Sequence, residues 1–189
     1  FAKNNNLKVI NYLDKKNLEK LITSVDIVIH AASINSENCN RNKRNCFKFN
    51  YEYTKYLYKL ALKSKVKKFI FLSTIHVYSS FLQGLITTKS KRRNNDAYAL
   101  SKRYAENYLI NNSLKATKVI IMRLSNVYGI GENKKYNLSN SFIHQFCKEV
   151  VIKKTITINN YDKINRNIIS LNNFSKILIY IIYKNYKSS

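Results

Sequence analysis

Tyr98 and Lys102 are a pair of side chains whose types and spacing could move a proton. They lie four residues apart at the start of a stretch with a helical pattern, so both side chains fall on one helix face, one turn apart. An ammonium in that place favours the phenolate and is expected to lower the tyrosine pKa from about 10 towards neutral pH. Such a pair can act as acid and base on a substrate hydroxyl. Because the chain has 15 Tyr, chance pairs are expected, and the argument depends on the elements around this one.

Apolar strand patterns and helical patterns alternate along the chain. The predicted strands are residues 7–10, 25–30, 68–73, 118–124 and 155–158. The predicted helices are residues 15–23, 47–64, 98–111, 139–150 and 172–184, with a long loop at 79–97. Several of the strands are β-branched runs typical of strands buried on both sides. The alternation predicts an α/β fold in which a parallel sheet is covered on both faces.

Three predicted strands end in small or hydrogen-bonding residues, which lie at 30–32, 73–74 and 124–126. In parallel sheets, ligands bind at the carboxyl ends of the strands. The helix with Tyr98 and Lys102 follows the second of these strand ends. The pattern therefore predicts a pocket on which a hydroxyl, a phenol and an ammonium converge.

Charge and length bound the class of protein. The 189 residues, 45% of them hydrophobic, are enough for one core-forming domain. A net charge of +24, from 34 basic and 10 acidic residues, is typical of nucleic-acid or anionic-membrane binding. The basic residues are scattered, however, and come with many residues of A/T-rich codons, so coding bias is the preferred explanation. The densest basic cluster, at 89–93, lies in a predicted loop and remains a candidate for attracting phosphate groups.

The cysteines and histidines carry no clear site. Cys39, Cys46 and Cys147 are odd in number and lack metal-ligand spacing, which favours reduced thiols in a cytoplasmic protein and no metal. The histidines, His30, His76 and His144, are expected to be structural. The apolar segment at 177–183 is far shorter than the ~20 residues that span a bilayer, so no membrane partner is expected.

Six sequence motifs occur in a fixed order, at 28–32, 50–54, 69–78, 98–106, 123–131 and 156–168. Together they resemble the NAD-dependent epimerase/dehydratase family, the extended branch of the short-chain dehydrogenases. The resemblance covers about residues 7–180. It implies a Rossmann-type doubly wound parallel sheet, with residues 1–130 as a partial NAD(P)-binding domain. Residues 131–189 are then part of a small substrate-binding region interleaved with the last Rossmann elements.

The resemblance also implies roles for individual residues. Thr74 would hydrogen-bond the reacting oxygen, Tyr98 would be the acid and base, and Lys102 would hold the nicotinamide ribose. The residues implied to line the cofactor, NAD or NADP, are Asn11, Tyr12, Ala31, Ala32, Asn50, Ser73, Lys102, Leu124, Asn126 and Val127. The residues implied to contact the substrate are Thr74, Asn126 and Arg166.

Two of the chain's departures from the family pattern bear most directly on function. The Gly-x-x-Gly-x-x-Gly loop that approaches a pyrophosphate is absent, which we interpret as truncation of the first strand-helix-strand. On that interpretation the fragment alone binds dinucleotide poorly. Family dehydratases carry Asp-Glu directly after the catalytic Thr, whereas this chain has Ile75 and His76, which argues against removal of water from the sugar.

These expectations combine into an NAD(P)-dependent oxidoreductase or isomerase that acts on a nucleotide-linked sugar, of the epimerase type. The alternatives within the family are a reductase or dehydrogenase, a non-catalytic NAD(P)-binding relative, and an inactive fragment. The net positive charge suggests one alternative, a nucleic-acid-binding module. Its affinity for nucleic acid would fall steeply as the salt concentration rises. Relatives often dimerise through a helix bundle that includes the Tyr–Lys helix, so a homodimer is expected.

Overall fold

The computed structural model describes residues 7–10, 14–79, 84–113, 116–129, 142–154 and 167–184. The chain divides into two compact units. The first comprises residues 1–80 and 89–123, and the second comprises residues 81–88 and 124–189. Each unit is described separately below. The predicted domain boundary at residue 130 stays a prediction.

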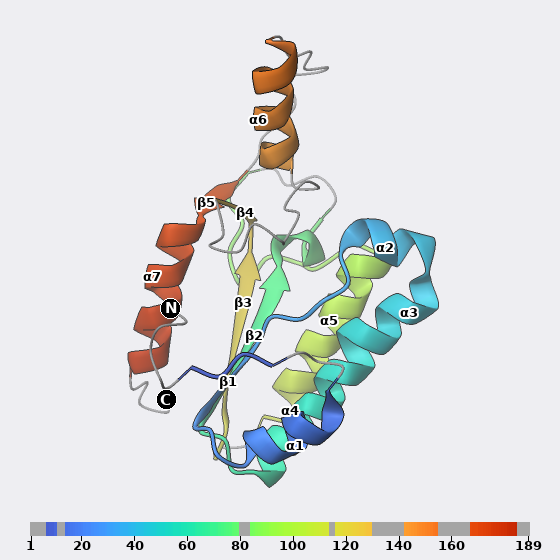
Figure 1. Ribbon diagram of the computed structural model, residues 1–189. Helices are drawn as coiled ribbons and strands as arrows, with labels where there is room; N and C mark the ends of the chain where they lie inside the picture. The colour runs from blue at the N-terminus through green and yellow to red at the C-terminus, as the bar shows by residue number, and fades with distance from the viewer. Residues whose placement is uncertain are drawn as a thin grey trace. The chain divides into compact units, whose positions relative to one another are not determined.

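The first unit contains a three-stranded sheet in the order β1-β2-β3. The strands are β1 (Ile27–His30), β2 (Lys68–Thr74) and β3 (Lys118–Leu124). Strands β1 and β2 are parallel, with Ile27 opposite Lys68 and His30 opposite Phe71, and the arrows of β2 and β3 point the same way in Figure 1. Their carboxyl ends therefore lie at one edge, as the alternating pattern predicted.

Helices and short helical turns alternate with the strands along the chain of the first unit. They are α1 (Lys15–Ile22), α2 (Ser36–Arg41), α3 (Lys43–Phe47), a π-helical turn (Lys48–Glu52), α4 (Tyr53–Lys63), a 3-10 turn (Ile75–Val77) and α5 (Ala97–Asn111). Figure 1 shows α4 and α5 on the same side of the strands. Asp96 begins α5 by accepting a hydrogen bond from the Ala99 N–H at 2.7 Å, a side-chain cap typical of Asp.

The core of the first unit lies between the sheet and these helices. Its fully buried members include Tyr58 on α4, Phe69 and Phe71 on β2 and Leu109 on α5. The Tyr58 and Phe69 rings meet edge to face with centroids 5.1 Å apart, an arrangement favoured between aromatic rings. Packing at this point sets the distance between α5 and β2, the two elements that carry the predicted catalytic residues.

The second unit contains a two-stranded parallel sheet and two helices. They are β4 (Asn126–Tyr128), α6 (Phe142–Lys153), β5 (Ile168–Ser170) and α7 (Leu171–Tyr183). Gly129 follows β4 with φ 146°, and a Cβ there would lie 2.8 Å from the Leu171 Cβ, so both backbone and packing require glycine. The strand predicted at 155–158 lies outside the described residues.

Residues 7–10 were predicted to form a strand, and this prediction is wrong. They have no regular secondary structure, although Ile10 packs against the core. A strand exists only where a neighbour accepts and donates its hydrogen bonds, and these residues are not part of either sheet in the described chain. An apolar run predicts burial, but it does not supply that neighbour.

The prediction of reduced thiols is wrong for two of the three cysteines. Cys39 and Cys46 form a disulfide with their Cα atoms 4.8 Å apart. The chain turns back at Asn42, which ends α2 and caps α3 through its own side chain, and this turn brings the two cysteines together. Cys147 on α6 is a free, exposed thiol.

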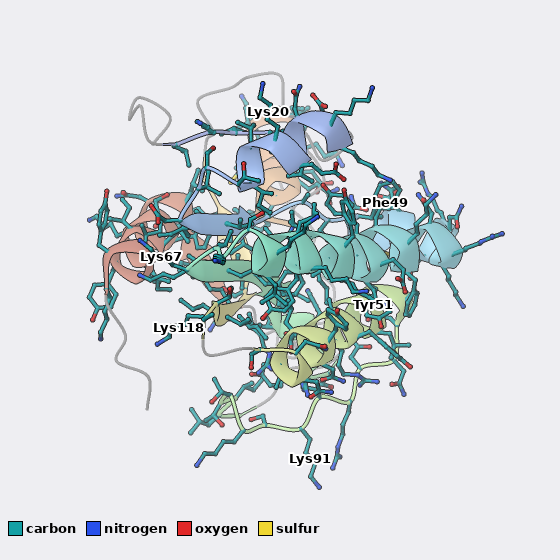
Figure 2. The ribbon with its side chains drawn as sticks, turned by 90° about the horizontal axis from the view of Figure 1, so that it is seen from below. Lys20, Phe49, Tyr51, Lys67, Lys91 and Lys118 are labelled. Atoms are coloured by element: carbon teal, nitrogen blue, oxygen red, sulfur yellow. A yellow bond between two sulfur atoms is a disulfide. The ribbon has the colours of Figure 1, made fainter. Side chains whose placement is uncertain are left out.

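Basic side chains leave the first unit in several directions. Figure 2 shows Lys20, Lys67 and Lys91 well apart, on α1, before β2 and in the loop before α5. This dispersal is consistent with the scattered basic residues of the sequence. Among the described residues, no helix is both long and apolar enough to cross a membrane.

Candidate functional site

Tyr98 lies near the start of α5 and faces the end of β2. Its side chain forms hydrogen bonds with Thr74, the last residue of β2, and with Ser33, in the loop after β1. The Thr74 hydroxyl also accepts a hydrogen bond from the His76 N–H at 3.2 Å. The structure therefore brings together the phenol and the hydroxyl that the sequence analysis paired, and it adds a second hydroxyl.

Lys102 lies one turn further along α5 and is 2% exposed. Its ammonium donates a hydrogen bond to the Leu72 carbonyl at 3.0 Å and stands 4.8 Å from the centre of the Phe71 ring. Burial lowers the pKa of Lys102 to about 8, against the opposing effect of the Glu106 carboxylate. The lysine is therefore held at the end of β2, within the same edge of the sheet as Thr74.

The expected effect of Lys102 on the acidity of Tyr98 is wrong for this structure. Burial raises the pKa of Tyr98 above its usual value of 10.0, and the hydrogen bonds from Thr74 and Ser33 oppose that rise only in part. Desolvation disfavours the phenolate, and helical spacing gives no information on burial. Tyr98 consequently holds its proton at neutral pH in this structure.

His30 ends β1 and is a buried structural histidine, as predicted. Its Nε2 lies 2.8 Å from the Thr54 hydroxyl, and that hydroxyl donates to the Asn50 carbonyl at 2.8 Å. The hydroxyl proton is thus engaged, so Nε2 carries the hydrogen and donates it to Thr54. Burial, with the Lys102 charge in addition, lowers the pKa of His30 to about 3, and the ring is neutral.

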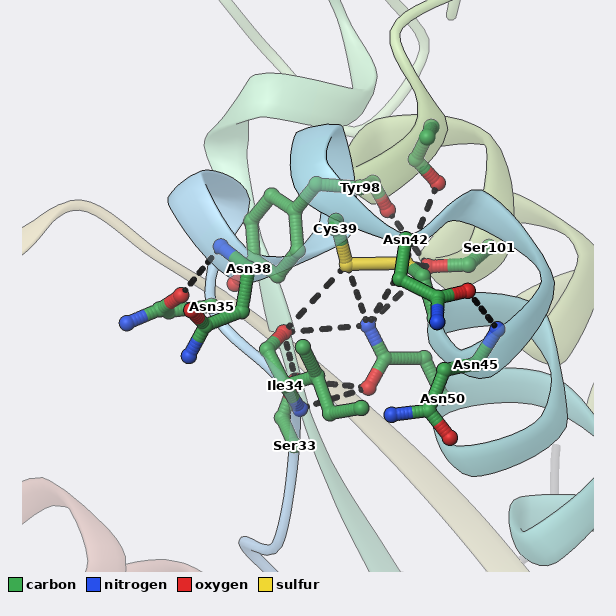
Figure 3. Close-up of a disulfide and its surroundings, with 12 residues drawn as sticks. Ser33, Ile34, Asn35, Asn38, Cys39, Asn42, Asn45, Asn50, Tyr98 and Ser101 are labelled. Carbon is green, nitrogen blue, oxygen red and sulfur yellow. Dashed lines mark hydrogen bonds between the residues drawn. A yellow bond between two sulfur atoms is a disulfide. The ribbon is translucent and has the colours of Figure 1, made fainter.

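Asn50 lies in the π-helical turn and is 1% exposed. Its carboxamide oxygen accepts from the Ile34 N–H at 2.8 Å and from the Ser33 hydroxyl at 3.1 Å. Its amide nitrogen donates to the Ile34 carbonyl and to the Ser101 hydroxyl, each at 3.1 Å. Figure 3 shows this carboxamide between the Ile34 backbone and the disulfide. Asn50 therefore clamps the loop after β1 to α5, and its implied contact with a cofactor stays a prediction.

The loop after β1 borders a small hollow at the carboxyl end of that strand. Ala31 is exposed and Ala32 is half-buried. The lining residues of the hollow are Ala32, Ser33, Ile34, Phe49 and Tyr53. The implied cofactor contacts of Ala31 and Ala32 stay predictions.

The other predicted site residues fall into three groups. Asn11, Tyr12 and Arg166 lie outside the described residues. Leu124, Asn126 and Val127 belong to the second unit, where the Asn126 side chain donates to the Asn167 carbonyl at 3.2 Å. Ser73 is 5% exposed and donates to Glu106. Cofactor or substrate contacts of all these residues stay predictions.

Sequence reasoning missed two polar residues of this site. Ser33 directly follows the predicted cofactor residues Ala31 and Ala32, and this position was the available signal. Glu106 lies four residues beyond Lys102, so its helical spacing placed it on the same face. The disulfide had no comparable signal, because a separation of seven positions indicates neither a metal site nor a bridge.

The fold, with Tyr98, Lys102 and Thr74 gathered at the strand ends, is that of an α/β protein of the Rossmann class. The sequence profile of the NAD dependent epimerase/dehydratase family matches residues 2–187, and the chain belongs to this family. The resemblance found in the motifs is thereby confirmed.

Individual relatives agree with this family. The chain is 29% identical over 153 residues to an ADP-L-glycero-D-manno-heptose-6-epimerase of Brachyspira hyodysenteriae, covering 75% of this chain and 47% of the relative. It is 32% identical over 176 residues to a dTDP-D-glucose 4,6-dehydratase of Dictyostelium discoideum, covering 83% of this chain and 38% of the relative. Its fold resembles the UDP-glucuronic acid 4-epimerase from Bacillus cereus in complex with UDP-glucuronic acid and NAD. In that comparison the TM-score is 0.77 and the identity 20%, with 94% of this chain and 55% of the other covered. The chain spans about half the length of such relatives, or less.

Proposed function

We propose that the protein acts with NAD, or NADP, on a nucleotide-linked sugar, in a reaction of the epimerase type. The observation that carries the proposal is the Tyr98 hydroxyl, which is hydrogen-bonded to Thr74 and Ser33, with Lys102 buried one helical turn away. The names of the curated relatives, a sugar-nucleotide epimerase and a sugar-nucleotide dehydratase, support the substrate class.

Tyr98 and Thr74 are the residues that would handle the substrate proton. In this proposal Thr74 hydrogen-bonds the reacting oxygen of the sugar, and Tyr98 exchanges a proton with it. Since Tyr98 holds its proton at neutral pH, it is ready to donate, and a positive charge bound beside it would lower its pKa for the reverse transfer. Lys102 would hold the ribose next to the nicotinamide. When bound, NAD accepts and returns hydride.

The residues after Thr74 favour epimerisation or simple oxidation and reduction over dehydration. Ile75 and His76 occupy the 3-10 turn that follows the strand. Removal of water from a sugar needs an acid and a base besides the tyrosine, and Ile75 provides neither. The proposal therefore differs from the reaction named for the Dictyostelium relative. A reductase or dehydrogenase remains the alternative within the family.

Replacing Tyr98 by Phe tests the proposal directly. Tyr98→Phe removes the hydroxyl and keeps the ring, so turnover of a nucleotide sugar should fall to background while nucleotide-sugar binding persists. Tyr104→Phe, on the exposed side of the same helix, is the matched control and should retain wild-type turnover. Wild-type turnover in Tyr98→Phe would refute the assignment of the acid and base.

The exposed face of α5, with the neighbouring end of α3 and the π-helical turn, supports a homodimer as part of this proposal. Tyr104 is 50% exposed and Ile110 is 49% exposed. Phe47 and Tyr51 each meet the Tyr104 ring edge to face at 5.7 Å. An exposed tyrosine beside two half-buried aromatic rings is typical of an interface. Sedimentation of the purified protein should give twice the monomer mass, and a monomer mass would count against this point.

A further inference from the structure

Glu106 is a buried carboxylate on the catalytic face of α5. Its side chain is fully buried, and it lies four residues beyond Lys102 and eight beyond Tyr98, so the three titratable groups form one stripe along the helix. Burying an unpaired carboxylate is costly. The surroundings of Glu106 must therefore contain groups that compensate its charge.

Two arginines and one hydroxyl supply that compensation. Arg123 of β3 binds both carboxylate oxygens, through Nε at 3.0 and 3.1 Å and through a terminal nitrogen at 2.8 Å. Arg92, in the loop before α5, binds at 2.9 Å, and Ser73 of β2 donates its hydroxyl at 2.5 Å. Charge-assisted and bidentate bonds of this kind fix geometry as well as charge. The carboxylate thus joins α5 to two strands and to the preceding loop.

The end of β2 and the stripe on α5 interlock. Three consecutive strand residues each contact one member of the stripe: Leu72 with Lys102, Ser73 with Glu106 and Thr74 with Tyr98. Because the contacts come from consecutive residues, a shift of α5 along β2 would break all of them together. The position of Tyr98 relative to Thr74 therefore depends on the Glu106 contact one strand residue away.

Glu106 is also the negative group that Lys102 faces. From β1, His30 is neutral because burial holds its pKa at about 3. On α5, Tyr98 is neutral as well, and β2 offers the Phe71 ring and the Leu72 carbonyl. Glu106 opposes the effect of burial on the Lys102 pKa. The positive charges of Arg92 and Arg123, which pair with Glu106, limit how far Glu106 raises the Lys102 pKa.

We propose that Glu106 is a positioning residue of the site, which fastens the Tyr98–Lys102 face of α5 to the strand ends and supplies the negative charge that Lys102 faces. The inference rests on the proposed function for its meaning, since it concerns the same catalytic pair. Its test needs no turnover, so a failure of the proposed function would be seen separately, in the Tyr98→Phe assay.

The test is the titration of Lys102, followed by NMR of the purified protein with isotope-labelled lysine. The signal that disappears in Lys102→Arg identifies the residue. In the wild type the midpoint should lie at about pH 8. Glu106→Gln should shift it to lower pH, and Glu106→Asp, which keeps the charge, should restore most of the shift. Glu37→Gln, which removes a carboxylate from an exposed ion pair with Arg41, is the control and should leave the midpoint unchanged.

Arg92→Ala gives a prediction of opposite sign. Arg92 comes from a loop and its side chain is 27% exposed, so its loss should be tolerated. Removing this cation leaves the field of Glu106 less compensated, and the Lys102 midpoint should move to higher pH. A folded Glu106→Gln protein that titrates like the wild type would overturn the proposal. If Glu106→Gln does not fold, Arg92→Ala decides, and a midpoint that stays or falls would overturn it.

Discussion

Asn50→Ala is the substitution that separates a structural clamp from a cofactor contact. The wild-type carboxamide makes four hydrogen bonds to the loop after β1 and to Ser101, and its nitrogen also donates to each sulfur of the disulfide at 3.5 Å. Alanine removes every one of them without adding bulk. The effect should therefore appear in stability measured without any nucleotide present.

The magnitude follows from which partners can find replacements. The Ile34 N–H loses its partner, and an unpaired buried group costs about 1–3 kcal/mol, whereas the Ile34 carbonyl still accepts from the Ser33 hydroxyl at 3.1 Å. Ile34 is half-buried, so water recovers part of that cost. The Ser33 hydroxyl is on an exposed residue, and the Ser101 hydroxyl keeps its bond to the Tyr98 carbonyl at 2.8 Å. The expected loss of unfolding free energy is therefore about 1–3 kcal/mol, mostly from the Ile34 N–H.

Urea denaturation without nucleotide measures this loss. Asn107→Ala, at an exposed position on α5, is the matched control, and its unfolding free energy should stay within about 0.5 kcal/mol of the wild type. An Asn50→Ala protein as stable as the wild type, with weaker nucleotide binding, would refute the clamp. That result would instead support the cofactor contact implied by the family resemblance.

Two further predictions concern stability. Cys39 and Cys46 are seven positions apart, and closing so short a loop restricts the unfolded chain by about 2.5 kcal/mol. Urea denaturation with and without dithiothreitol should therefore differ by this amount, and equal stabilities would count against the bridge. The second prediction is acid destabilisation by His30, whose pKa is about 3 in the folded protein and 6.5 as its reference. Between these values the unfolded state binds the extra proton, so stability falls as pH falls, by up to about 1.4 kcal/mol per pH unit. His30→Gln should flatten this part of the pH–stability curve, and an unchanged slope would contradict the assignment.

Local patterns predicted most elements of the first unit. The β-branched run at 25–30 and the apolar run at 68–73 became β1 and β2, and the helix predicted at 98–111 became α5 with Asp96 as its cap. These elements have a periodicity and end signals that depend on nearby residues alone. The helix predicted at 47–64 is interrupted by a π-helical turn. That turn carries Asn50, whose contacts with Ile34 and Ser101 are tertiary and cannot be derived from spacing.

The proximity of Tyr98, Lys102 and Thr74 was predictable from the sequence, but the electrostatics of these residues were not. Spacing placed Tyr98 and Lys102 on one face, and the rule of strand ends placed Thr74 nearby. The direction of the Tyr98 pKa shift depends on burial, which results from packing of the whole unit. Arg123 pairs with Glu106 across an interval of 17 residues, and no local rule selects that arginine from the many basic residues of the chain.

Two polar clamps hold α5, one within the turn that carries Tyr98 and Lys102 and one in the turn after it. Asn50 binds Ser101 and so fixes the helix to the loop that carries Ser33. Glu106 fixes the next turn to the ends of β2 and β3. The hydroxyl of Tyr98 meets one group from each anchored segment, Ser33 from the loop and Thr74 from the strand. Its position is therefore determined by both clamps, and a helix with correct Tyr–Lys spacing but without Asn50 and Glu106 would present the same residues without the same alignment.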